Sequence, residues 1–159
     1  SDLIMNKSTL LVILFVAALF VACDSKREYE YNEIIENDTW NIKKAYKHQF
    51  EIKDSMQWYN MYLNVRNTND YKYSNLFLYV TTTFPHGQKA KDTVECVLAN
   101  TQGKWFGKGN GKYKDCRIIF KPKFRFSQVG TYHLQIEHGM REQDVVGISE
   151  IGIRLEKFN

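Results

Sequence analysis

The sequence has 159 residues, of which 43% are hydrophobic and 14% aromatic, and its formal net charge is +4. This length fits one domain, and the aromatic content is enough to build a hydrophobic core, which excludes an intrinsically disordered chain and a fold that needs a metal to hold it. The small positive charge neither requires nor rules out a nucleic-acid partner.

Residues 1–22 have the pattern of a signal peptide. Ser1 to Ile4 precede a Met-Asn-Lys start, and we interpret them as a tag or an upstream reading. Twelve apolar residues then fill positions 10–21. A membrane-spanning helix needs about 20 apolar residues, so twelve are too few. The segment is therefore predicted to be an export signal that ends at Ala22.

Cys23 follows the apolar run directly. A small residue before a cysteine at the end of an export signal resembles the bacterial lipoprotein signal, in which acyl chains, palmitate among them, are attached to that cysteine. The resemblance implies that Cys23 is the mature N-terminus and the lipid anchor, and stable anchoring takes more than one acyl chain. An ordinary secretory signal with an incidental cysteine is the alternative. We expect no nucleic-acid partner for an exported protein.

Residues 24–38 are charged and lack a sustained apolar period. We predict that residues 23–38 are a lipidated N-terminus and a short tether, followed by one folded domain over residues 39–159. An ordered first strand around Tyr29 to Ile35 is the alternative.

From Trp40 onward, apolar residues recur with a period of two, which predicts strands with one buried face. The pattern is plainest over residues 59–66, 76–84 and 132–137, and further strands are expected at residues 48–52, 93–98, 117–121 and 151–155. In the last of these regions the apolar parity shifts, which predicts a β-bulge near Ser149 and Glu150.

Residues typical of turns separate these runs, at positions 67–75, 85–88 and 129–131. Short strands at intervals of about 8 to 12 residues predict an all-β fold, an antiparallel β-sandwich of jelly-roll or immunoglobulin-like type.

Cys96 and Cys116 are the two cysteines of the predicted domain. Their spacing suits facing positions on two neighbouring strands, and an exported protein reaches an oxidising compartment, so a disulfide between them is one interpretation. Two buried free thiols are the other.

The sequence offers no assembled catalytic or metal site. The glycine-rich stretch "FGKGNGK" (residues 106–112) lacks the helix that a phosphate-binding loop requires, so we interpret it as a hairpin loop. The four histidines, His48, His86, His133 and His138, are scattered, and we expect them to be solvated surface groups. We therefore predict no enzyme activity, no metal and no cofactor.

A basic segment runs from Lys104 to Arg125, with eight basic residues, one acid and interleaved aromatic rings. It predicts a surface for an acidic partner, a glycan or lipid headgroups, and the residues chosen for that partner surface are Lys104, Trp105, Phe106, Lys108 and Lys112. Charges that solvate a hairpin and pair with neighbouring acids are the alternative.

Three long stretches resemble the GldH family of gliding-motility lipoproteins of the Bacteroidota. They are "NVRNTNDYKYSNLFLYVTTTFPHG" (residues 64–87), "DTVECVLANTQGKWFGKGNGKYKD" (residues 92–115), and "MRE" followed by "GISEIGIRLEK" (residues 140–157). The resemblance implies a non-enzymatic envelope lipoprotein that is required for gliding. It also implies an outer-membrane location and protein partners in the gliding and type IX secretion machinery.

A carbohydrate-binding surface lipoprotein is the competing hypothesis. In that case exposed Trp105 and Phe106 rings would stack on sugars.

Overall fold

The computed structural model describes residues 24–158, which form ten strands and one short 3₁₀ turn. In chain order these are β1 (Arg27–Ile34), η1 (Glu36–Asp38), β2 (Thr39–Asn41), β3 (Tyr46–Ile52), β4 (Trp58–Thr68), β5 (Asn75–Thr83), β6 (Lys89–Val97), β7 (Tyr113–Phe124), β8 (Gly130–His138), β9 (Asp144–Val146) and β10 (Ile148–Phe158).

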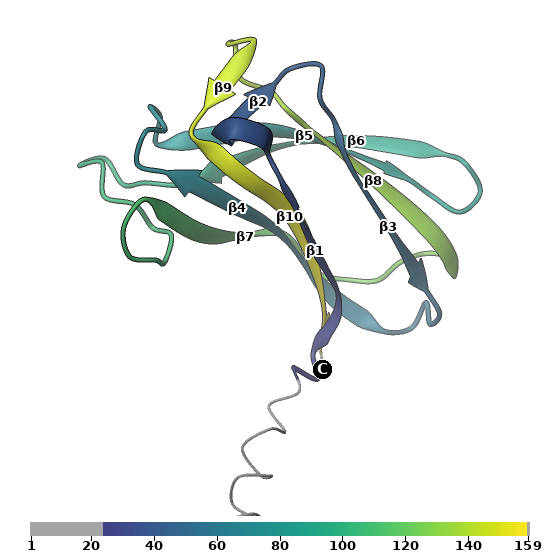
Figure 1. Ribbon diagram of the computed structural model, residues 1–159. Helices are drawn as coiled ribbons and strands as arrows, with labels where there is room; N and C mark the ends of the chain where they lie inside the picture. Colours follow the sequence, from purple (N-terminus) through teal and green to yellow (C-terminus); the bar gives the residue numbers. More distant parts are fainter. Residues whose placement is uncertain (1–23, 159) are drawn as a thin grey trace, which may run out of the picture.

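Two four-stranded sheets pack face to face (Figure 1). The first sheet has the order β1-β10-β4-β7 and the second has the order β3-β8-β5-β6, while β2 and β9 form a separate two-stranded ribbon. All pairings are antiparallel. The predicted antiparallel β-sandwich is therefore confirmed.

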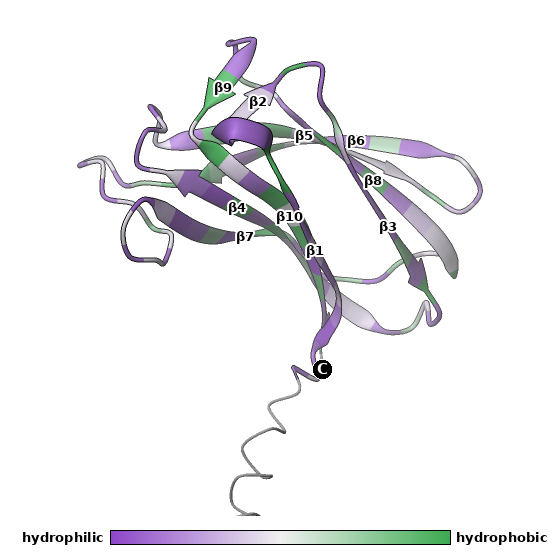
Figure 2. Ribbon diagram, in the orientation of Figure 1, coloured by the Kyte–Doolittle hydropathy of each residue, from purple (hydrophilic) through white to green (hydrophobic). Residues whose placement is uncertain are grey.

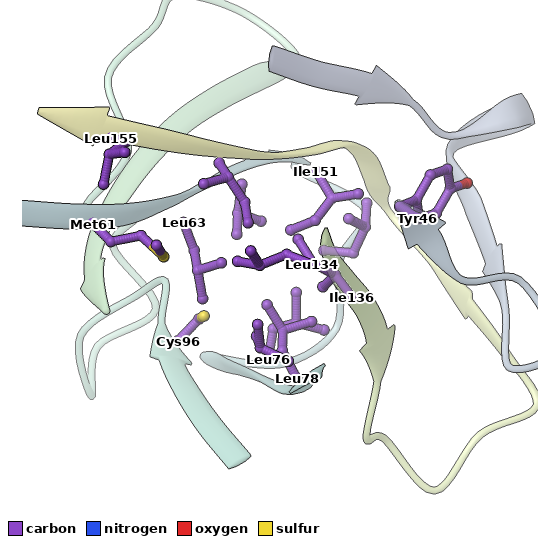
Figure 3. Packing of buried hydrophobic residues seen from close by; sticks show 14 of the residues in the cluster. Tyr46, Met61, Leu63, Leu76, Leu78, Cys96, Leu134, Ile136, Ile151 and Leu155 are labelled. Carbon is purple, nitrogen blue, oxygen red and sulfur yellow. The ribbon is translucent and has the colours of Figure 1, made fainter. Parts of the chain in front are cut away.

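The core lies between the two sheets, and the strand alternation of the sequence places it there. In β4 the buried apolar residues are Tyr59, Met61, Leu63 and Val65, and the residues between them point outward. Leu76 and Leu78 of β5 and Leu134 and Ile136 of β8 face them from the second sheet (Figure 3). Burial of these apolar side chains supplies the main stabilising free energy of the sandwich.

The predicted bulge in the last strand is also found. The pairing of β10 with β4 shifts register between Ile148 and Glu150, and Ser149 is buried at the shift. From Ile151 to Leu155 every residue of β10 is buried, because the strand lies inside its sheet between β1 and β4.

Residues 27–34 are a strand, where the prediction placed a tether. β1 pairs with β10 along its whole length, Tyr29 packs on Phe50 with ring centroids 5.3 Å apart, and Ile35 beyond it is buried. The alternative of an ordered first strand is what the structure has, and three of the described residues, 24–26, precede it. The predicted signal peptide and Cys23 lie outside the described residues.

The sandwich has two distinct ends. We call the end at which β1 begins and β10 finishes the near end, and the opposite one the far end. At the near end, residues 24–26 lie beside Phe158 and next to the loops at residues 53–57 and 125–129 (Figure 1). At the far end lie the loops at residues 69–74 and 98–112. Within residues 24–158, no helix is long and apolar enough to cross a membrane.

Candidate functional site

The outer face of the first sheet carries a groove of about 700 Å³. Its floor is formed by residues of four strands, most of them outward-facing, and its wall by the 98–112 loop. The lining residues are Glu30, Asn32, Asn64, Val65, Arg66, Phe106, Lys108, Asp115, Cys116, Arg117 and Glu150. In Figure 2 hydrophilic colours recur along β1, β4 and β7, and in β4 the outward polar positions alternate with the core residues.

Gly152 gives the floor part of its depth. It pairs with Asn32 on β1 and with Asn64 on β4. A Cβ atom at position 152 would lie 1.9 Å from Asn32 Oδ1, so the glycine leaves room for the Asn32 side chain. That side chain accepts a hydrogen bond of 3.0 Å from Asn64 Nδ2.

The charges of the floor are paired with one another. Arg66 Nε lies 2.6 Å from Asp115 Oδ1, and its Nη1 pairs with Glu150. Arg117 Nη2 lies 3.0 Å from Glu30 Oε1. Burial opposes ionisation of Glu30, but hydrogen bonds from Arg154 and Asn64 hold its pKa below the usual value. The floor is thus a set of ionised groups held in place by their own partners.

Arg154 anchors this network from beside the groove. Its side chain is only 6% exposed, and it pairs with Asp24, with Glu30 at 2.5 Å and with Glu156 at 2.6 Å. A buried cation is tolerated only where anions compensate for the lost water, so the three carboxylates account for its position.

Phe106 and Lys108 form the wall of the groove. Phe106 is 59% exposed although it is a large apolar side chain. Within residues 24–158, the Lys108 ammonium has no carboxylate partner. An exposed ring and an unpaired charge that stand beside a floor of paired polar groups are suited to binding another molecule.

The structure brings together two of the five residues predicted for the partner surface, namely Phe106 and Lys108. Lys104 is exposed on the same loop but does not line the groove. Trp105 is half-buried, packs against the core and has its ring centroid 6.5 Å from that of Tyr71. Lys112 pairs with Asp38 at 3.0 Å.

The basic segment does not form one surface. Lys112, Arg117 and Lys121 pair with acids on other elements, as the alternative interpretation expected. Lys123 and Arg125 lie at the near end, away from the 98–112 loop. Sequence reasoning missed the floor of the groove, and the polar positions of "YNMYLNVRN", Asn64 and Arg66 among them, were the signal that could have revealed it.

Two of the histidines are buried, which contradicts the expectation that all four are surface groups. His48 and His138 are 3% and 2% exposed, because both fall on the inward positions of their strands. His86 and His133 are exposed. Among residues 24–158, no three His, Cys, Asp or Glu side chains converge as metal ligands would.

A second hollow, of about 410 Å³, lies on the outer face of the second sheet. Its lining residues are Lys47, His48, Gln49, Thr81, Thr83, Lys89, His133, Leu134 and Gln135. Apart from His48 and His133 none of them carries a ring, so the hollow offers no phenyl or indole platform on which a sugar would stack.

Cys96 and Cys116 are free thiols in the structure. They belong to β6 and β7, the edge strands of different sheets, and not to neighbours within one sheet. Burial raises the pKa of Cys96 to about 12 and also raises the pKa of Cys116. The disulfide between them stays a prediction.

Comparison with known proteins identifies a family whose sequence pattern this chain matches. Residues 27–155 match the GldH lipoprotein family. The gliding motility lipoprotein GldH homolog of Christiangramia forsetii is 34% identical over 153 residues, which cover 92% of this chain and 93% of the relative. The gliding motility lipoprotein GldH of Flavobacterium johnsoniae is 30% identical over 154 residues, covering 92% of this chain and 94% of the relative.

Solved structures resemble the chain only distantly. A chain of infectious bursal disease virus, Gx strain, superposes with a TM-score of 0.35 and 13% identity, over 85% of this chain and 30% of the viral one. Dimeric latent PorU from Porphyromonas gingivalis gives 0.34 and 9% identity, over 86% of this chain and 14% of PorU. Similarity this low bears on neither fold nor function.

Proposed function

The chain belongs to the GldH lipoprotein family, and on that premise we propose that its domain is an assembly component that docks an envelope protein of the gliding machinery in the groove beside Phe106. It is a gliding-motility lipoprotein, and so a lipid-anchored protein of the envelope, from a family with no known catalytic activity. The finer proposal is a non-enzymatic role in the outer membrane, beside gliding and type IX secretion proteins.

Cys23 is the proposed lipid attachment site, with residues 1–22 as the cleaved signal. In this proposal the folded domain begins only a few residues after the anchor, because β1 starts at Arg27. The 98–112 loop belongs to the far end of the sandwich, so it would point away from the anchor toward partners.

The main support for partner docking is the exposed side chain of Phe106 in the wall of the groove. A phenyl ring that is 59% exposed costs solvation free energy in the isolated domain and regains it when a partner covers the ring. Aromatic side chains are enriched among the few residues that supply most of the free energy of protein association. The Lys108 ammonium beside the ring would favour an acidic partner surface through charge complementarity. The paired floor residues would contribute shape and hydrogen-bond specificity.

The experiment replaces the two wall residues, Phe106 and Lys108, and leaves the residues of the floor unchanged. Phe106→Ala/Lys108→Ala is expected to lower capture of gliding or type IX secretion components from crosslinked membranes at least tenfold, since loss of one hot-spot side chain typically costs about 2 kcal/mol. Colony spreading of a gliding host should fall with it. The readout is quantitative mass spectrometry of what co-purifies with the full-length lipoprotein.

Lys104→Ala is the matched control, because Lys104 is exposed on the same loop but lies outside the groove. It should leave capture and spreading unchanged. The groove would be excluded as the docking site if the double variant, folded to the same melting temperature, captured the same partners as the unaltered protein.

The carbohydrate-binding alternative has less support. It needed Trp105 as an exposed stacking ring, and that ring is half-buried against the core. No specific observation favours this function.

A further inference from the structure

The near end of the sandwich exposes large apolar side chains. Met56 in the β3–β4 loop is 69% exposed, Trp58 at the start of β4 is 38% exposed, and Phe158 at the end of β10 is 37% exposed. Trp58 and Phe158 are cross-strand neighbours, and Gln57 donates a hydrogen bond of 3.3 Å to the Phe158 carbonyl. The three side chains therefore form one patch.

Cations lie over this patch. The Arg125 guanidinium is 4.6 Å from the centre of the Trp58 ring, and it also contacts the Met56 sulfur at 3.9 Å. The Lys123 ammonium is 5.5 Å from the centre of the Phe158 ring. Rings with cations at their faces combine an apolar surface with a positive charge at the same place.

The basic residues of this end outnumber its acids. They are Lys26, Lys53, Lys123, Arg125 and Lys157, against Asp24, Glu28 and Asp54. Lys157 pairs with Glu28 at 2.9 Å, and Asp24 pairs with Arg154. Within residues 24–158, the other four basic residues have no carboxylate within salt-bridge distance, so the near end keeps a positive excess.

The patch is also the part of the domain closest to the proposed anchor. Three residues separate Cys23 from Arg27, and an extended chain spans at most about 3.5 Å per residue. Lys26 lies directly beside the patch, because its carbonyl accepts a hydrogen bond of 2.8 Å from the Lys157 amide. A lipid on Cys23 would thus hold the patch within about 15 Å of the membrane surface.

We infer that the near end is a membrane-contacting surface, in which Trp58, Phe158 and Met56 enter the interfacial layer and the surrounding lysines and Arg125 bind anionic lipid headgroups. The inference rests on the proposed lipidation of Cys23. Tryptophan is favoured at membrane interfaces because its ring is apolar and its N–H is polar. Each basic residue at an anionic surface strengthens binding about fivefold.

The test uses the mature lipoprotein reconstituted into vesicles that contain anionic lipid and lipid brominated near the headgroup. Quenching of Trp58 fluorescence reports contact between the near end and the membrane, with Trp58→Phe giving the background from the other tryptophans. We expect Trp58 to be quenched at low salt. In Lys53→Gln/Lys123→Gln the docking equilibrium should fall about 25-fold, since two cations are lost while Arg125, the cation over the Trp58 ring, is kept.

Lys72→Gln/Lys104→Gln is the matched control, because it removes the same charge from two exposed loop positions at the far end. It should leave Trp58 quenching unchanged. Quenching no greater than background, or equal loss in both double variants, would overturn the inference. So would shielding of Trp58 from a soluble quencher without quenching by the brominated lipid, because a protein would then cover the patch.

Two independent readouts separate this inference from the proposed function. The mass of the N-terminal peptide shows whether Cys23 is acylated, and partner capture by the Phe106 groove does not involve Trp58. Failure of Trp58 quenching in an acylated protein that still captures its partner would reject the membrane surface alone.

Discussion

His48 and His138 place ionisable groups inside the sandwich. His48 lies on the inward side of β3, where its Nδ1 is 3.3 Å from the Tyr29 hydroxyl. Burial lowers its pKa from 6.5 to about 4, and burial also lowers the pKa of His138. Both rings are therefore neutral in the folded protein near pH 7, and protonation must be coupled to unfolding.

This coupling predicts a loss of stability as the pH falls. Between the unfolded pKa of 6.5 and the folded pKa of about 4, the unfolded chain binds the extra proton at His48, so the free energy of unfolding decreases by about 3 kcal/mol over that range. In His48→Phe this contribution disappears, and the pH dependence of urea unfolding between pH 7 and pH 4.5 should be flatter by about that amount.

His133→Gln is the control, since it removes an exposed histidine from the neighbouring strand and should keep the pH dependence of the unaltered protein. If His48→Phe unfolded with the same pH dependence as the unaltered protein, burial of His48 would not be the source of acid sensitivity.

Among the strands, β1 is the one whose structural role differs most from the role that its sequence predicts. Two of its outward residues, Glu28 and Glu30, are charged, and they pair with residues far along the chain, such as Arg117 and Arg154 for Glu30. Its inward Tyr29 packs on the second sheet. β1 therefore covers one edge of β10 and links the two sheets.

Replacing residues 27–34 with a glycine–serine linker tests this role. A tether would tolerate the change, whereas loss of β1 leaves Arg154 with fewer anionic partners and exposes the edge of β10. We expect loss of cooperative thermal unfolding, or a decrease in the free energy of unfolding of more than 4 kcal/mol, measured by circular dichroism. A cooperative transition at the original temperature would contradict the assignment of β1 as structural.

The sequence predicted those elements that local alternation specifies. β4, β5 and β8 each carry four or three apolar residues at every second position, and their inward faces are as expected. β1 was predicted only as the alternative to a tether, because the charges of Glu28 and Glu30 made the segment resemble a linker and their cationic partners are distant in sequence. The half-buried position of Trp105 was not predicted for the same reason, since its ring lies beside Tyr71 of another loop.

For the whole molecule, the two ends have different surfaces. The near end carries Met56, Trp58 and Phe158 among uncompensated basic residues, next to residues 24–26. The groove wall belongs to the far-end loop, where Phe106 and Lys108 border a floor of paired charges. This difference between the two ends is consistent with the two proposals, in which the near end contacts the membrane and the groove binds a protein of the gliding machinery.

Photocrosslinking from within the groove is the sharpest test of partner docking at Phe106. A photoreactive amino acid at position 106 of the full-length lipoprotein, irradiated in living cells, should give one predominant adduct with an envelope protein of the gliding or type IX secretion machinery. The same group at position 56 should crosslink to lipid. Docking of a partner in the groove would be contradicted by the absence of any protein adduct from position 106, or by the same adducts from both positions.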